Sequence, residues 1–256
     1  REKIEQLAID LEKANARLRE LDQQKSEFVS FASHQLRSPL TAIKGYASMI
    51  LEGIYGKLDS KVTDPISKIF QSTTTLASMV EDYLNISRIE LGSMKYVCSD
   101  FDLRKLVEDV IGEMRPNIEK AKLQLTFDFN KQELYQVTAD LVKIKQVIAN
   151  LIDNSVKYTP TGSIAVSIEK RPDGKILVSV KDTGVGISKE VMPHLFARFS
   201  RASNASSVNI LGTGLGLYVA LKMVEGQNGR VWAESEGEGK GSTFFLELPD
   251  KHGPVC

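Results

Sequence analysis

The first hydrophobic pattern along the chain is a heptad repeat. Apolar residues, with one lysine among them, recur at alternating spacings of three and four over the first 28 positions, and charged residues lie between them. Such a stripe is the seam of a coiled coil and has to be buried against a partner. The pattern predicts a dimerising helix from the start of the chain to about Glu52. Its seam consists of Ile4, Leu7, Leu11, Ala14, Leu18, Leu21, Lys25 and Phe28.

A second helix of the same kind is predicted after a short turn. Residues 53–60 carry two glycines, which indicates the turn, and apolar residues then recur from Val62 to Tyr83 until the pattern ends near Gly92. Two antiparallel helices, joined by the same pair from a second chain, form a four-helix bundle. Residues 1–92 are therefore predicted to be a helical hairpin that dimerises.

His34 lies outside both apolar seams of the first helix, since a second seam, shifted in phase, runs from Leu36 to Ile50. The histidine is therefore predicted to be accessible to solvent. Pro39 has no amide hydrogen for the turn below His34, which predicts a bend there. A solvent-exposed surface histidine on a coiled coil is the alternative, so the chemistry of His34 depends on the rest of the chain.

From Lys95 onward the heptad pattern ends, and the spacing of apolar residues predicts short strands and helices in alternation. Asp102 and Asp140 are placed as N-caps of helices over residues 103–121 and 141–156. Strands are predicted over 96–99, 123–129, 163–169, 175–181, 230–234 and 241–248, and further helices over 189–195 and 215–225. This order predicts an α+β two-layer sandwich, with helices on one side of a mixed sheet.

Composition narrows the possible partners. The formal net charge is zero, which argues against nucleic acid or an acidic membrane surface as a partner. The two cysteines, Cys98 and Cys256, are too few for a disulfide framework and favour a reducing, cytoplasmic setting. No apolar run is as long as a membrane span. Because the chain begins in mid-heptad, we expect it to be the cytoplasmic part of something longer.

The helix predicted over 141–156 carries polar residues suited to a nucleotide. Asn150 and Asn154 lie four residues apart and face the same way, and amide oxygens can bind Mg²⁺ beside nucleotide phosphates. Lys157 could add positive charge to those phosphates, and Tyr158 could flank a base or a sugar. The two asparagines could equally be caps or exposed polar residues.

Short glycine-containing motifs recur in the last third of the chain. Asp182 offers an acceptor for an exocyclic amine, and Gly184 and Gly186 would keep side chains away from a flat ring, although Asp-Thr-Gly is also common in loops. The glycine-rich residues 212–216 open a helix, where backbone amides can bind phosphate or simply form a turn. The polar residues between Arg201 and Leu211 form either a mobile nucleotide lid or an idle surface loop.

The order of these motifs resembles the catalytic core of sensor histidine kinases of two-component systems. Residues 31–40 resemble the H box, 150–158 the N box, 182–186 the G1 box, 196–199 the F box, 212–217 the G2 box and 239–244 the last glycine box. The resemblance extends over residues 26–248. It implies a Bergerat ATP-binding fold after a dimeric four-helix bundle, and a sensor domain upstream of this chain. It also raises the expectation that this chain is the cytoplasmic portion of a membrane-bound sensor.

The resemblance also implies domain boundaries. Residues 1–25 would be a coiled-coil signalling helix, 26–93 the dimerisation and histidine phosphotransfer domain, 94–100 a linker, 101–250 the catalytic ATP-binding domain and 251–256 a tail. The hinge between the two domains is expected in the linker from Gly92 to Asp100, where the helical pattern lapses.

Residue roles follow from the same resemblance. His34 would accept a phosphoryl group from Mg²⁺-ATP and pass it to an aspartate of a response-regulator receiver domain. Asn154 would be the Mg²⁺ ligand with Asn150 beside it, and Arg201 would meet the phosphate during transfer. The other implied nucleotide-binding residues are Lys157, Tyr158, Asp182, Gly184, Gly186, Arg198, Gly212, Gly214, Leu215, Gly216 and Thr243.

Two positions depart from the family pattern and keep other functions open. Gln35 replaces the usual acid and cannot accept a proton at neutral pH, and Ser38 stands where many relatives place Thr or Asn for phosphatase action. One alternative is a pseudokinase scaffold that binds nucleotide but transfers nothing. The other is an ATPase clamp of the same superfamily, but Asn150 stands where its water-activating glutamate would be expected.

Overall fold

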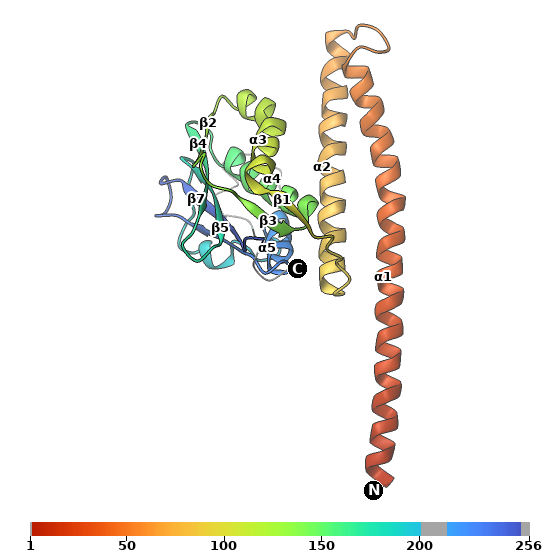
Figure 1. Ribbon diagram of the computed structural model, residues 1–256. Helices are drawn as coiled ribbons and strands as arrows, with labels where there is room; N and C mark the ends of the chain where they lie inside the picture. The colour runs from red at the N-terminus through yellow and green to blue at the C-terminus, as the bar shows by residue number, and fades with distance from the viewer. Residues whose placement is uncertain (1, 201–213, 252–256) are drawn as a thin grey trace. The chain divides into compact units, whose positions relative to one another are not determined.

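The computed structural model describes residues 2–200 and 214–251 (Figure 1). For some residues of the first helix, His34 among them, only the backbone is described. The chain divides into two compact units, residues 1–94 and 95–256, and each is described here by itself.

The first unit is a hairpin of two long helices, α1 (Glu2–Leu51) and α2 (Ser60–Glu90). Both predicted helices and the turn between them are confirmed. The turn requires Gly53 at a φ of 79°, and Asp59 caps α2 by accepting a hydrogen bond of 2.9 Å from the Lys61 amide. Pro39 lies inside α1 and does not end it, because the helix can lose one hydrogen bond without stopping.

The hairpin buries only part of its apolar surface. Val29 and Ala47 of α1 and Leu84 and Ile86 of α2 are buried, while a longer set of large apolar side chains stays exposed. An isolated chain would present this stripe to water, which is unfavourable at about 25 cal/mol per Å² of apolar area. The exposed members of the two helices are Leu11, Leu18, Leu21, Phe28, Phe31, Leu36, Ile43, Tyr46, Val62, Ile69, Leu76 and Tyr83.

The second unit is built on a five-stranded sheet with the order β2-β4-β5-β7-β6. The strands are β2 (Gln124–Phe129), β4 (Ser163–Lys170), β5 (Ile176–Asp182), β6 (Arg230–Glu234) and β7 (Ser242–Leu248). Only β2 and β4 run parallel, so the predicted mixed sheet is confirmed.

Three helices cover one face of this sheet: α3 (Leu103–Lys120), α4 (Leu141–Lys157) and α5 (Gly216–Glu225) (Figure 1). The N-caps of α3 and α4 are Asp102 and Asp140, as predicted, and both accept hydrogen bonds from backbone amides of the first turn. Buried residues alternate along β4, at Ile164, Val166 and Ile168, and they belong to the same core as the apolar face of α4.

Three short elements differ from the prediction. The strand expected over residues 96–99 is wrong: β1 spans Ser99–Asp102 and pairs antiparallel with β3 (Gln136–Ala139), which was not predicted. Both strands have four residues, too few for a clear alternation. The helix expected over 189–195 is reduced to a 3₁₀ turn, η1 (Met192–His194), whose first turn contains a proline.

Candidate nucleotide site

The centre of the site is the carboxylate of Asp182, at the end of β5. Asp182 is 2% exposed, and its Oδ1 accepts hydrogen bonds from the Gly184 amide (2.9 Å) and the Ser242 amide (3.2 Å). Its Oδ2 accepts from the hydroxyls of Ser242 (2.5 Å) and Ser155 (3.5 Å). Hydrogen bonds to an ionised acceptor are stronger than neutral ones, so this set holds a buried charge in a fixed orientation.

The glycines after Asp182 are required by close backbone packing. A Cβ on Gly184 would overlap the Tyr158 carbonyl, and one on Gly186 would overlap the Gly237 carbonyl. The Val185 amide also donates to Tyr158 O at 2.9 Å. These contacts bring the loop after β5 against the C-terminal end of α4 and against the loop before β7. The predicted neighbours Asp182, Gly184, Gly186 and Tyr158 are therefore brought together.

Thr159 adds an unsatisfied polar group to the same place. Its hydroxyl is the one buried side-chain polar atom without a hydrogen-bond partner in the described part of the chain, and a Cβ built on Gly184 would lie 2.8 Å from it. Buried hydroxyls are nearly always hydrogen-bonded, by water or a ligand where protein offers no partner. A polar molecule beside the Gly184 loop would satisfy it.

On α4 the two predicted asparagines interact directly. Asn154 Nδ2 donates to Asn150 Oδ1 at 3.0 Å, which leaves Asn154 Oδ1 as the oxygen available to a cation. Lys157 pairs with Asp153 at 2.5 Å and would have to leave that partner to meet a phosphate. The described residues contain no cluster of three or more His, Cys, Asp or Glu side chains. Mg²⁺ would fit here only if the nucleotide supplied further oxygens, as is usual for this ion.

The N-terminus of α5 begins at a glycine-rich segment. Leu215 precedes the helix and gives no side-chain cap, and the first backbone amides of a helix are groups that can bind phosphate. The Leu215 side chain itself is 5% exposed and belongs to the core. A Cβ on Gly216 would lie 2.6 Å from Asn150 Nδ2, which places the start of α5 directly beside the asparagines of α4. Gly214 has a φ of 67°, which favours glycine.

Other predicted residues lie as follows. The Arg198 guanidinium donates to the Tyr218 hydroxyl at 2.9 Å and stacks over its ring, next to the start of α5. Thr243 follows Ser242 on β7, so its side chain points to the opposite face of the sheet from the one that contacts Asp182. Arg201 and Gly212 lie outside the described residues.

On the helical hairpin, the backbone of His34 lies within α1, and its side chain is outside the described residues. Gln35 and Ser38 are exposed. Ser38 shares a shallow surface hollow with Arg37, Thr41 and Ala42.

Sequence reasoning missed four residues of the site: Ser155, Thr159, Tyr218 and Ser242. Ser155 follows Asn154 directly and Ser242 follows the last glycine pair, so their position in the motifs was a usable signal. The contacts of Thr159 with Gly184 and of Tyr218 with Arg198 join distant parts of the chain, and no pattern in the sequence indicates them.

A buried carboxylate beside glycine loops, paired asparagines and a glycine-led helix N-terminus define a nucleotide-binding domain, and it shares a chain with a helical hairpin. Residues 139–252 match the family model described as histidine kinase-, DNA gyrase B- and HSP90-like ATPase, and residues 24–92 match the His Kinase A (phospho-acceptor) domain. The chain belongs to the histidine kinases and comprises their catalytic core.

Individual relatives agree with this assignment. The chain is 34% identical to the non-motile and phage-resistance protein of Caulobacter vibrioides over 98% of its own length and 30% of that protein. It is 30% identical to the sensor histidine kinase GacS of Pseudomonas protegens, over 96% of its length and 27% of that protein. The chain thus spans about a third or less of the length of these relatives.

Among solved structures, the chain resembles histidine kinase ThkA in complex with the response regulator protein TrrA. The TM-score is 0.58 and the identity 25%, over 88% of this chain and 61% of that one. Within the part of the chain that the structure describes, no helix is long and apolar enough to cross a membrane.

Proposed function

We propose that this chain is the core of a dimeric kinase that transfers the γ-phosphoryl group of ATP to His34 and then passes it to an aspartate of a response-regulator receiver domain. One observation carries the proposal: a phospho-acceptor domain and a site with Asp182, Asn154 and the start of α5 occur in one chain. Transfer of phosphate from one half to the other gives both halves a role.

Different residues of the site would bind different parts of ATP. The Asp182 carboxylate is held in one orientation by Ser242, Ser155 and the Gly184 amide, and it would accept a hydrogen bond from the adenine amine in that orientation. The backbone amides at the start of α5 would hold phosphate, with Lys157 and Arg198 nearby as cations. When bound, Mg²⁺ would neutralise charge on the phosphates, and Asn154 Oδ1, which accepts no hydrogen bond from Asn150, would be its protein ligand.

The transfer itself breaks the bond between the γ-phosphorus and the bridging oxygen of ATP and forms a phosphorus–nitrogen bond at His34. ADP leaves with the electron pair of the broken bond, and the imidazole proton passes to water. Positioning and charge neutralisation dominate such reactions. Gln35 cannot take the proton, but its side-chain oxygen can orient the imidazole N–H.

The exposed Gln35 favours one second candidate, a nucleotide-binding scaffold without transferase activity. The two functions differ in one observable, because the scaffold binds ATP and leaves His34 unmodified. An ATPase clamp finds less support, because Asn150 occupies the position where its glutamate would be needed and is engaged with Asn154.

The proposed partners are a second copy of the chain and a receiver domain. The exposed apolar stripe on α1 and α2 supports dimerisation, and the similarity to ThkA, whose solved complex contains a response regulator, supports the receiver domain. We also propose a cytoplasmic location, where ATP and receiver domains are found.

The test is incubation of the purified chain with Mg²⁺ and radiolabelled ATP, beside His34→Ala. We expect label that is acid-labile and base-stable in the native chain and absent from His34→Ala. ATP binding without any label would instead support the scaffold, and Gln35→Glu would then be the next variant.

A further inference from the structure

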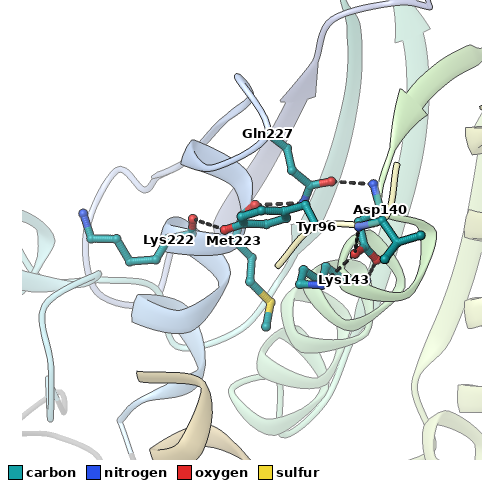
Figure 2. A network of polar contacts seen from close by, with 7 residues as sticks. Tyr96, Asp140, Lys143, Lys222, Met223 and Gln227 are labelled. Atoms are coloured by element: carbon teal, nitrogen blue, oxygen red, sulfur yellow. Dashed lines mark hydrogen bonds and ion pairs between the residues drawn. The ribbon is translucent and has the colours of Figure 1, made fainter. Parts of the chain in front are cut away.

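The segment that follows the helical hairpin is attached to the nucleotide-binding domain by its own residues. The Val97 amide donates to Asp140 Oδ2 at 2.9 Å. The Tyr96 hydroxyl donates to the Lys222 carbonyl at 3.4 Å (Figure 2). The Tyr96 ring also lies 5.1 Å from the Lys143 ammonium. Residues 96 and 97 therefore belong to the nucleotide-binding domain, although the sequence assigns them to a linker.

The residues that contact Tyr96 and Val97 belong to a buried polar network that joins α4 to α5. Asp140 caps α4 and is 3% exposed, and Gln227, 2% exposed, follows α5. Gln227 Oε1 accepts from the Asp140 amide at 2.6 Å, while Gln227 Nε2 donates to the Met223 carbonyl at 2.8 Å (Figure 2). The network thus ties the N-terminal end of α4 to the C-terminal end of α5 and presents both to the linker.

Steric fit makes the attachment specific for an aromatic ring. A Cβ on Gly226 would overlap the Tyr96 hydroxyl and lie 2.5 Å from Tyr96 Cζ and 2.9 Å from Cε2. Gly226 has an ordinary helical φ of −66°, so the backbone does not require glycine there. The absence of a side chain is needed only to admit the ring.

The other ends of the same two helices carry the nucleotide site. Asn150 and Asn154 lie in the C-terminal half of α4, and Gly216, packed against Asn150, begins α5. The anchored residues are consequently fixed to the elements that hold ATP.

The opposite end of the linker is fixed to the hairpin. The Ser93 amide donates to the Arg88 carbonyl at 2.9 Å, beyond the C-terminus of α2. With Ser93 held on one side and Tyr96 on the other, Met94 and Lys95 remain, and the boundary between the two compact units falls between them.

We propose that the pivot between the two domains is confined to Met94 and Lys95, and that Tyr96 is a positioning residue that keeps this tether short. The proposed pivot is thus two residues long, whereas the sequence predicts a hinge over residues 92–100. The position of the pivot does not depend on the proposed kinase function, but its effect on the rate of phosphorylation does. Release of residues 96–98 would lengthen the free segment from two residues to five. For a flexible tether that already spans its two sites, the effective concentration falls as about the −3/2 power of its length, so a change from two residues to five would lower the effective concentration of the nucleotide site near His34 about fourfold.

The anchor is the contact of the Tyr96 ring with Gly226, and two variants test it. Tyr96→Ala removes the ring, and Gly226→Ala fills the space that the ring occupies. The matched control is Gly112→Ala in α3, where a Cβ would meet nothing within 4 Å. Tyr96→Phe keeps the ring and removes only the long hydroxyl contact, so it should behave like the native chain. Amide hydrogen exchange at Val97, ATP affinity and the rate of label incorporation are measured on the full chain.

We expect a protected Val97 amide in the native chain and in Gly112→Ala, and fast exchange in both anchor variants. Those variants should incorporate label about fourfold more slowly at unchanged ATP affinity. An unprotected Val97 amide in the native chain would overturn the proposed pivot. Loss of protection at an unchanged rate, or with a proportional loss of ATP affinity, would overturn the positioning role of Tyr96. If the native chain takes no label at all, the kinase proposal fails, and the exchange data alone still decide where the pivot lies.

Discussion

At the scale of single residues, Asp182 is the side chain that we propose contacts the nucleotide. Its carboxylate is buried and accepts four hydrogen bonds from Gly184, Ser242 and Ser155, so its charge and orientation are set before any ligand arrives. Asp182→Asn keeps the volume but replaces one acceptor oxygen by a donor. We expect ATP affinity to fall by roughly 10- to 100-fold, the range for a hydrogen bond to a charged group.

That prediction is checked by calorimetric titration with ATP. Asp128→Asn, at an exposed position of β2 in the same sheet, is the control and should bind as the native chain does. Native affinity in Asp182→Asn would remove Asp182 from the proposed adenine site.

The N-cap Asp140 gives the domain a predictable response to acid. Burial alone would raise the pKa of Asp140, but hydrogen bonds from the Lys143 ammonium and from the Val97 and Lys143 amides outweigh it and lower the pKa below the ordinary 3.8. A lowered carboxyl pKa means stability that is present above pH 3.8 and is lost as the pH falls through the lower folded value.

We therefore expect the free energy of unfolding of the native chain to decline in that acidic window. Asp140→Asn keeps a capping side chain but cannot titrate, so its unfolding free energy should be lower at neutral pH and should decline less in acid. Urea denaturation at a series of pH values measures both. Parallel curves for the two proteins would show that Asp140 does not contribute as proposed.

Residues were predictable where their chemistry is local. Asp102 and Asp140 were recognisable as caps because each precedes an apolar helical pattern by one position. Ser242 and Ser155 lie 60 and 27 residues from Asp182 and were missed: their places beside the motifs were a signal, but a contact with a carboxylate so far along the chain is not visible in the sequence.

At the scale of elements, α5 shows how packing overrides helix propensity. Alanine in a helix is favoured over glycine by about 1 kcal/mol, yet a Cβ on Gly216 would lie 2.6 Å from Asn150 Nδ2. We expect Gly216→Ala to retain the helical circular dichroism signal and to bind ATP more weakly, since it pushes the start of α5 away from the asparagines of α4.

Gly112→Ala in α3 is the matched control, because its added methyl meets no neighbour. If Gly216→Ala bound ATP with native affinity, the contact between α4 and α5 would not shape the site.

Elements were foreseen in proportion to their length. The long helices and the strands with at least five residues follow clear apolar periods, whereas β1 and β3 have four residues each and pair although α3 and β2 lie between them in the chain. The contact that holds the linker was not predictable either, since nothing in the sequence indicates that Tyr96 fits against Gly226.

At the scale of the whole molecule, the exposed stripe on the hairpin predicts dimerisation. Ile69 is 46% exposed in the single chain and belongs to the repeating apolar positions of α2. We expect Ile69→Glu to weaken the dimer by at least tenfold, because burial of an unpaired carboxylate costs several kcal/mol. Gln71→Glu, at an exposed polar position of α2, should leave the dimer intact.

Analytical ultracentrifugation over a concentration series distinguishes the two variants. A monomeric native chain, or an Ile69→Glu chain that dimerises as well as the native one, would contradict this assignment of the stripe.

The order of the motifs made the two-domain organisation predictable from the sequence, since a heptad-patterned hairpin followed by alternating strands and helices has few interpretations. The path of phosphate between the domains was not predictable in the same way, because it depends on how the domains move. It is also the central claim of this account.

The most direct test locates the phosphate. The native chain is incubated with Mg²⁺-ATP, kept at alkaline pH, digested and mapped by mass spectrometry, beside Asp182→Asn and His34→Ala. The account predicts one phosphate on His34, sharply reduced in Asp182→Asn and absent from His34→Ala. A native chain that binds ATP without modifying His34, or that carries acid-stable phosphate on another residue, would contradict it.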